Sequence, residues 1–261
     1  MKEKRHCECR LLRRPKQSRL IPTTLLLCLI SAATSAQPES PISKKYASIL
    51  AHDFTRIVLA PAHWHKKDWL RFGVASSAVG LSMAVLDKPA ENLVQRNRNH
   101  ATDLFAKRVE PFGRHYPSAV IIGWYGAGLI FKDSTAKTAA LDAASATTIA
   151  SLVVTPLLKE VFGRRRPWEN QGPHHFEPFS GAESFPSGHS MRAFTLASVM
   201  ASHYRRTWVK ITCYTLAGLV AWSRMEYDVH YLSDVMGGAA IGTSIGLCVT
   251  KLNRKLRYGS K

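Results

Sequence analysis

The chain has 261 residues, of which 46% are apolar and 21% are charged, so it can build a packed core and is not a disordered tail protein. Its 36 basic and 18 acidic residues give a formal charge of +18. A balance this basic is typical of proteins that bind nucleic acid or anionic membranes, and the distribution of the charge decides between the two.

The first 36 residues have the order of an export signal. They hold eight basic and two acidic residues, then an apolar run over 20–33, then small residues before Gln37. The basic region is long, so an uncleaved anchor is the competing interpretation. We therefore divide the chain into a signal peptide or N-terminal anchor, an interfacial lead-in and a helical domain, over residues 1–36, 37–69 and 70–261.

Apolar stretches rich in Ala, Gly, Ser and Leu follow along the rest of the chain. Long alternating strand patterns are absent, so we predict an all-α, membrane-associated helical bundle. Most stretches are shorter than the roughly 20 residues that span a bilayer. Their small residues favour close helix approach in lipid or in a tight bundle. The stretches are 72–86, 118–131, 138–158, 193–202, 208–222 and 235–250.

Basic residues between these stretches predict an orientation. Arg205, Arg206 and Lys210 form one basic loop, and residues 251–261 form a basic tail, so both are expected in the cytoplasm and residues 159–189 outside. An exported N-terminus followed by three crossings would instead place 159–189 inside. One early stretch must therefore not span the membrane, or the leader is uncleaved and another stretch does not span.

The first chemical cluster runs from Lys159 to Pro167. Pro167 ends the preceding helix and leaves Lys159 and Arg166 roughly two turns apart, able to converge on one anion. Taken alone, such a run of bases is more often a solvated surface.

The second cluster is Phe185-Pro186-Ser187-Gly188-His189, which opens an apolar helical pattern. Backbone amides at a helix start form an anion cradle, to which Ser187 adds a hydroxyl, while Gly188 allows close approach. The alternative is an ordinary helix start with an incidental histidine.

The third cluster joins Arg224 to His230 and Asp234. The histidine and the aspartate are four residues apart, so on a helix they share a face and the carboxylate can accept a hydrogen bond from the imidazole. That bond would fix the tautomer and leave the other nitrogen nucleophilic. A capping pair beside a surface arginine is the simpler alternative.

Together the clusters supply the parts for metal-free phosphoryl transfer: two histidines, an orienting carboxylate, three cations and an amide cradle. No carboxylate cluster suited to Mg²⁺ accompanies them, and His174 and His175 lack a zinc-ligand spacing. We therefore predict no metal and no cofactor. Cys213 and Cys248, outside the leader, lie in apolar runs and are predicted to be buried thiols.

The ordered set of these motifs resembles the three-part signature of the type 2 phosphatidic acid phosphatase superfamily, which also includes bacterial acid phosphatases and vanadium haloperoxidases. The signature spans Lys159 to Asp234, and all eleven of its fixed positions match. The motifs are Lys159-x6-Arg166-Pro167, Pro186-Ser187-Gly188-His189 and Ser223-Arg224-x5-His230-x3-Asp234.

The resemblance implies a six-helix core and a two-step reaction through a phosphohistidine. By position, His230 would be the nucleophile, oriented by Asp234, and His189 the general acid. The phosphate would be bound by the remaining signature residues, which are Lys159, Arg166, Ser187, Gly188 and Arg224.

The function expected from this resemblance is hydrolysis of lipid phosphate or diphosphate monoesters in the membrane, because the apolar stretches flank the chemical clusters. The expected place is a bacterial inner membrane with the site facing the periplasm. The alternatives are a soluble periplasmic acid phosphatase, a vanadium-dependent haloperoxidase, or a non-catalytic membrane protein that binds lipid head groups.

Nucleic acid is the least favoured partner. A third of the excess positive charge lies in residues 1–36, and no basic stripe is interleaved with aromatic residues. The stretch from Trp64 to Trp69 is better explained as an interfacial anchor, with rings at head-group depth and Lys66 and Lys67 reaching anionic lipid. Core packing of these rings is the alternative.

Overall fold

The computed structural model describes residues 48, 52–57 and 59–258 of the chain. The predicted leader and the first part of the lead-in lie outside these residues. The described part is helical, and its β-structure is limited to one isolated bridge between Arg164 and Phe176. The all-α prediction is therefore confirmed.

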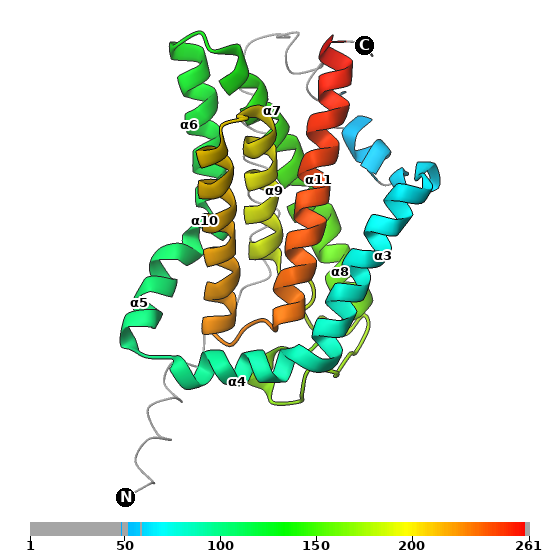
Figure 1. Ribbon diagram of the computed structural model, residues 1–261, viewed down its shortest axis with the longest axis vertical. Coiled ribbons are helices and arrows are strands. Elements are labelled where there is room, and N and C mark those ends of the chain that lie inside the picture. Colours follow the sequence, from blue (N-terminus) through cyan, green and yellow to red (C-terminus); the bar gives the residue numbers. More distant parts are fainter. Residues whose placement is uncertain (1–47, 49–51, 58, 259–261) are drawn as a thin grey trace, which may run out of the picture. The chain divides into compact units, whose positions relative to one another are not determined.

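The helices run up and down the bundle, and α4 crosses one of its ends (Figure 1). Two pairs of consecutive helices are each joined by one π-helical turn. Ser82–Leu86 joins α3 to α4, and Ala150–Val154 joins α7 to α8. The helices are α3 (Lys66–Leu81), α4 (Asp87–Asn97), α5 (His100–Val109), α6 (Tyr116–Ile130), α7 (Ser134–Ile149), α8 (Thr155–Phe162), α9 (Gly188–His203), α10 (Thr207–Glu226) and α11 (Leu232–Tyr258).

Helix α9 lies in the centre, between α10 and α11 (Figure 1). Glycines on α11 make the close approach of α9 possible. A Cβ added at Gly242 would lie 2.2 Å from the carbonyl oxygen of Met191, and one at Gly246 would lie 2.1 Å from Oγ of Ser198. Side chains larger than hydrogen do not fit there, so the small-residue pattern of residues 235–250 fixes how α11 meets α9.

Three helical rods are long and apolar enough to cross a membrane: Lys66–Asn97, Ser134–Phe162 and Leu232–Leu256. The first buries little of its apolar surface, since Leu70, Val74 and Leu81 are more than 60% exposed. An exposed apolar face of this kind fits a lipid environment. The chain is a membrane protein.

The aromatic residues at the start of α3 pack on one another at the surface. The rings of Trp64 and Trp69 meet edge to face, with their centroids 4.9 Å apart, and Phe72 completes the group. Trp69 and Phe72 are each half exposed, which agrees with an interfacial anchor better than with core packing.

Candidate active site

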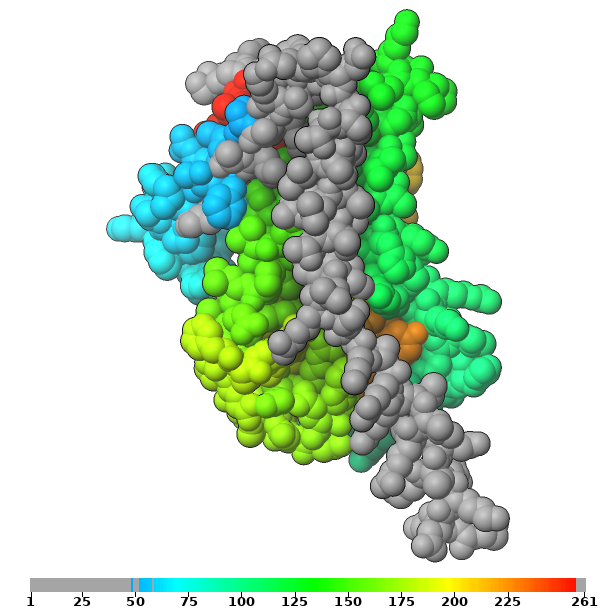
Figure 2. Space-filling model, turned by 180° about the vertical axis from the view of Figure 1, so that it is seen from behind, coloured from blue at the N-terminus to red at the C-terminus, as the bar shows by residue number. Residues whose placement is uncertain are grey.

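All three sequence clusters meet at one end of the bundle. The loop over residues 163–187 connects α8 to α9 at this end, and the turn over 227–231 connects α10 to α11 (Figure 1). From the opposite side, Figure 2 shows the loop and α8 as a lime-coloured surface at the same end. Gly163 starts the loop in a left-handed conformation, where a Cβ would overlap the carbonyl group of Glu177.

Lys159 and Arg166 converge on one carboxylate, but the helix ends at Phe162, before Gly163, and not at Pro167 as predicted. Nζ of Lys159 lies 3.6 Å from Oε2 of Glu183, and Nη2 of Arg166 lies 3.5 Å from the same atom. Both cations are mostly buried, whereas Glu183 is half exposed. An oxyanion of a substrate could therefore take the place of the Glu183 carboxylate between the two cations.

The cluster at the start of α9 is fixed to α11. The backbone N–H of Ser187 donates to the carbonyl oxygen of Asp234 at 3.0 Å, and its hydroxyl accepts from Ser190 at 3.1 Å. The Ser187 amide is therefore committed to α11. Gly188 is the first residue of α9, where the amides of a helix have no partner within the helix, and this end of α9 points toward the site.

His189 faces a carboxylate that the sequence motifs do not include. Its Nε2 lies 2.9 Å from Oε1 of Glu110, in the short helix Glu110–Gly113 after α5. Nη1 of Arg224 lies 3.6 Å from the same oxygen. The hydrogen bond to His189 lowers the pKa of Glu110 below its usual value, so the carboxylate is charged at neutral pH.

His230 is buried and its Nδ1 faces Asp234, but it lies in the turn before α11 and not on a helix with Asp234 as the spacing predicts. The separation between Nδ1 and Oδ2 of Asp234 is 3.6 Å, which is longer than a hydrogen bond. Burial lowers the pKa of His230 to about 3, so the imidazole is neutral at neutral pH. A neutral imidazole has a free lone pair and can act as a nucleophile.

The Asp234 carboxylate is held by other donors, which explains the longer separation. Its Oδ2 accepts from the Ser184 hydroxyl at 2.6 Å and from the Tyr231 amide at 2.8 Å. Its Oδ1 accepts from Nη1 of Arg164 at 2.5 Å. The aspartate is thus fixed in place beside the imidazole.

Arg164 is the residue that sequence reasoning missed most clearly. Its guanidinium is fully buried between two buried carboxylates, Asp87 and Asp234, at 2.6 and 2.5 Å. It also donates to the Ser233 hydroxyl at 2.7 Å and to the carbonyl oxygen of Pro173. This arginine therefore joins α4, the 163–187 loop and α11 beneath the site.

His174 and His175, which are not part of the signature, lie in the loop over residues 163–187. His175 is hydrogen-bonded to Glu177 at 2.8 Å, and Glu177 also pairs with Arg165. Among the residues that the structure describes, no group of three His, Cys, Asp or Glu side chains could hold a metal ion.

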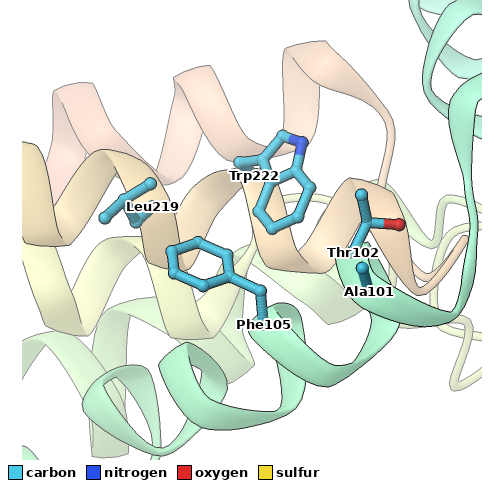
Figure 3. Close-up of a pocket in the computed structure, with 5 residues that line it drawn as sticks. All are labelled: Ala101, Thr102, Phe105, Leu219 and Trp222. Carbon is cyan, nitrogen blue, oxygen red and sulfur yellow. The ribbon is translucent and has the colours of Figure 1, made fainter.

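An apolar hollow of about 480 Å³ lies between α5 and α10, near the candidate site. Figure 3 shows the rings of Phe105 and Trp222 facing each other across it, with centroids 5.8 Å apart. Leu219, Ala101 and Thr102 complete the lining. Helix α5 leads directly into Glu110 and α10 carries Arg224, so both walls of the hollow continue into the site.

Comparisons with known proteins agree with this arrangement. Residues 139–258 match the model of the PAP2 superfamily. A lipid A 1-phosphatase of Rhizobium johnstonii is 32% identical over 142 residues, which cover 51% of this chain and 50% of that protein. The undecaprenyl-diphosphatase BcrC of Bacillus subtilis is 29% identical over 114 residues, which cover 44% of this chain and 58% of that protein. The chain thus spans about half the length of these curated relatives.

Solved structures show the same fold. The crystal structure of LpxE from Aquifex aeolicus aligns with a TM-score of 0.52 and 26% identity, over 64% of this chain and 96% of that one. The transmembrane PAP2-type phosphatidylglycerolphosphate phosphatase of Bacillus subtilis aligns with a TM-score of 0.50 and 22% identity, over 82% of this chain and 98% of that one.

Proposed function

We propose that the chain, whose residues 139–258 match the model of the PAP2 superfamily, is a phosphatase of lipid phosphate or diphosphate monoesters that works without a metal. The observation that carries the proposal is the convergence of the signature residues. Two histidines, each beside a carboxylate, stand at one end of the bundle with two cations that share a single oxygen of Glu183.

The first step is attack of His230 on phosphorus. Its Nδ1 faces Asp234, so Nε2 carries the lone pair that forms the N–P bond while the P–O bond of the ester breaks. His189 gives its proton to the leaving oxygen. Lys159, Arg166 and Arg224 hold the negative charge of the equatorial oxygens, with the Ser187 hydroxyl and the Gly188 amide.

The second step restores the enzyme. Water attacks the phosphohistidine with His189 now accepting a proton from the water, the N–P bond breaks, and inorganic phosphate leaves. Glu110, hydrogen-bonded to His189, would orient the ring and stabilise the positive charge that the ring gains when it accepts this proton.

A lipid substrate is supported by the apolar surroundings of the site. The hollow between α5 and α10 could hold part of an acyl or prenyl chain while the phosphate lies between Lys159 and Arg166. Relatives are named for lipid A and undecaprenyl diphosphate, both large amphipathic phosphates. A soluble acid phosphatase would have no need for the exposed apolar face of α3.

The proposed place is an inner membrane, with the site on the periplasmic side. The helices α3, α6, α7 with α8, α9, α10 and α11 cross the bundle in turn (Figure 1). Arg205, Arg206 and Lys210 then lie at the end away from the site, as the positive-inside rule requires of cytoplasmic loops.

This orientation is incompatible with an exported leader. Three crossings separate Lys66 from Lys159, so a periplasmic site requires Lys66 on the cytoplasmic side. Cleavage of an exported leader after residue 36 would place Lys66 on the other side and disagrees with this orientation.

The test is to trap the intermediate. Purified protein with EDTA and a ³²P-labelled lipid phosphate is expected to release phosphate and, on rapid quenching, to carry an acid-labile, base-stable phosphoryl group. His230→Ala should abolish both signals, a loss of at least about 10³-fold, while still binding the lipid. His174→Ala, an exposed loop histidine, is the matched control and should behave as the parent. Phosphate release that vanishes with EDTA would contradict the metal-free mechanism, and activity retained in His230→Ala would exclude the nucleophile.

A further inference from the structure

A second hollow lies at the end of the bundle opposite the histidines. Its volume is about 640 Å³, and it is bounded by the last turns of α9, the α9–α10 loop, α10 and α11. On α9, it lies about 20 Å from His189, at 1.5 Å per residue. The lining residues are Ala201, Ser202, Arg205, Lys210, Tyr214, Leu247 and Arg254.

The hollow is strongly cationic. Arg205, Lys210 and Arg254 come from three different parts of the fold, yet they line the same cavity. Within residues 59–256, no ion pair involves any of the three, whereas Asp142, an acidic residue of α7 in this half of the bundle, is hydrogen-bonded to His203 and Asn253. Three like charges around one cavity repel one another, so an anion placed among them would lower the energy of the folded protein.

The chemistry of the lining selects the anion. Two guanidinium groups can each donate a pair of parallel hydrogen bonds, which suits a phosphate better than a chloride ion. The amides of the first turn of α10 lie beside Lys210 and add positive potential.

The wall of the hollow is apolar on one side. Leu247 of α11 is about half exposed, and Ala201 of α9 also lines the hollow. Beyond the rim, Trp208 and Ile211 are more than 60% exposed on α10. A free phosphate would leave these apolar surfaces uncovered, but a phospholipid would place its phosphate among the cations and its chain along Leu247.

We propose that this hollow binds the phosphate-bearing head group of an anionic phospholipid in the leaflet opposite the candidate active site. The site is separate from the phosphatase proposal, because none of its residues belongs to the signature. A lipid held there would bridge α9, α10 and α11 at this end of the bundle.

The experiment is a titration of the purified full-length protein in detergent with short-chain phosphatidylglycerol, followed by native mass spectrometry. The variant Arg205→Gln/Lys210→Gln/Arg254→Gln removes the three cations of the hollow. The matched control, Lys132→Gln/Arg206→Gln/Lys255→Gln, removes three exposed cations outside it, so the change in net charge is the same. Thermal melting and phosphate release report that both variants are folded.

The hollow variant is expected to bind phosphatidylglycerol at least about tenfold more weakly, and the control variant within about twofold of the parent. Equal losses in both variants would show that only general surface charge attracts the lipid, and would overturn the site. Competition gives the source of the anion. Inorganic phosphate at millimolar concentration could displace the lipid and raise the melting temperature of the parent but not of the hollow variant. That result would show that the hollow binds free phosphate, and it would overturn the lipid assignment.

Discussion

At the residue scale, the two histidines of the candidate site are paired with carboxylates in different ways. His189 makes a direct hydrogen bond to Glu110, which lies 79 positions earlier in the chain. His230 faces Asp234 across 3.6 Å without a hydrogen bond. Glu110 is therefore in direct contact with its histidine, whereas Asp234 is held by Arg164, Ser184 and the Tyr231 amide.

Glu110 is therefore predicted to be a positioning residue for the acid. Glu110→Gln keeps the shape of the side chain but removes the charge that faces His189 and Arg224. We expect kcat to fall by about tenfold to a hundredfold with a smaller change in KM, together with a shift of the pH profile, because the histidine loses the charge that favours its protonated form.

Steady-state kinetics on a lipid phosphate over a range of pH checks this prediction. Glu160→Gln, an exposed glutamate of α8, is the control for the loss of one negative charge. A purely structural role for Glu110 would lower kcat at every pH by the same factor and leave the profile in place.

The buried imidazole of His230 predicts a second pH effect. Burial lowers its pKa to about 3, against about 6.5 for a histidine in an unfolded chain. Because the unfolded state then binds more protons, this group contributes stability that is fully present above pH 6.5 and is lost as the pH falls toward 3.

Between pH 5 and pH 8, NMR of selectively ¹⁵N-labelled histidine should accordingly show His230 signals that do not titrate, with the assignment made from His230→Ala. A midpoint near that of a free imidazole would mean that water reaches the ring, and the nucleophile would then lose its lone pair in mild acid.

At the element scale, glycines on α11 decide how closely two helices meet. Gly242→Ala would force a methyl group to within 2.2 Å of the Met191 carbonyl oxygen, a backbone atom that cannot rotate away. We expect a loss of about 2–4 kcal/mol in the free energy of unfolding and, because α9 and α11 carry His189 and Asp234, a fall in activity.

Gly73 of α3 provides the matched substitution. Nothing lies within 4 Å of a Cβ added there, so Gly73→Ala should raise stability by up to about 1 kcal/mol through helix propensity. Chemical denaturation in detergent measures both variants. Equal stability of the two alanine variants would show that α11 can shift away from α9 without penalty.

At the scale of the whole molecule, the sequence predicts the fold class and the signature residues but not the network beneath them. Lys159 and Arg166 are close in the chain, so their convergence can be predicted from the motif, although the end of the helix at Gly163 differs from the one predicted at Pro167. Arg164 is the first of three consecutive arginines, and nothing local distinguishes a buried arginine from an exposed one. Its carboxylate partners, Asp87 and Asp234, are 77 and 70 positions away.

Glu110 cannot be identified from the sequence for the same reason. The short helix that carries it reaches the site only after α5 and α6 have packed. Apolar periodicity finds helices, and motif spacing finds groups that are close in the chain. Ion pairs between distant segments depend on the packed bundle, and these are what hold His189 and Asp234 in place.

The orientation of the bundle can be tested on the whole molecule with single cysteines. In a background with all five native cysteines replaced by serine, Phe179→Cys places a thiol on the exposed 163–187 loop, and Lys132→Cys places one on the turn between α6 and α7 at the other end. We expect a membrane-impermeant maleimide applied to spheroplasts to label Phe179→Cys, and to label Lys132→Cys only after lysis, because the basic turns should stay in the cytoplasm. Phosphate release by each variant shows that it is folded. Labelling of Lys132→Cys in intact spheroplasts, with Phe179→Cys protected, would place the candidate site in the cytoplasm and reverse the proposed topology.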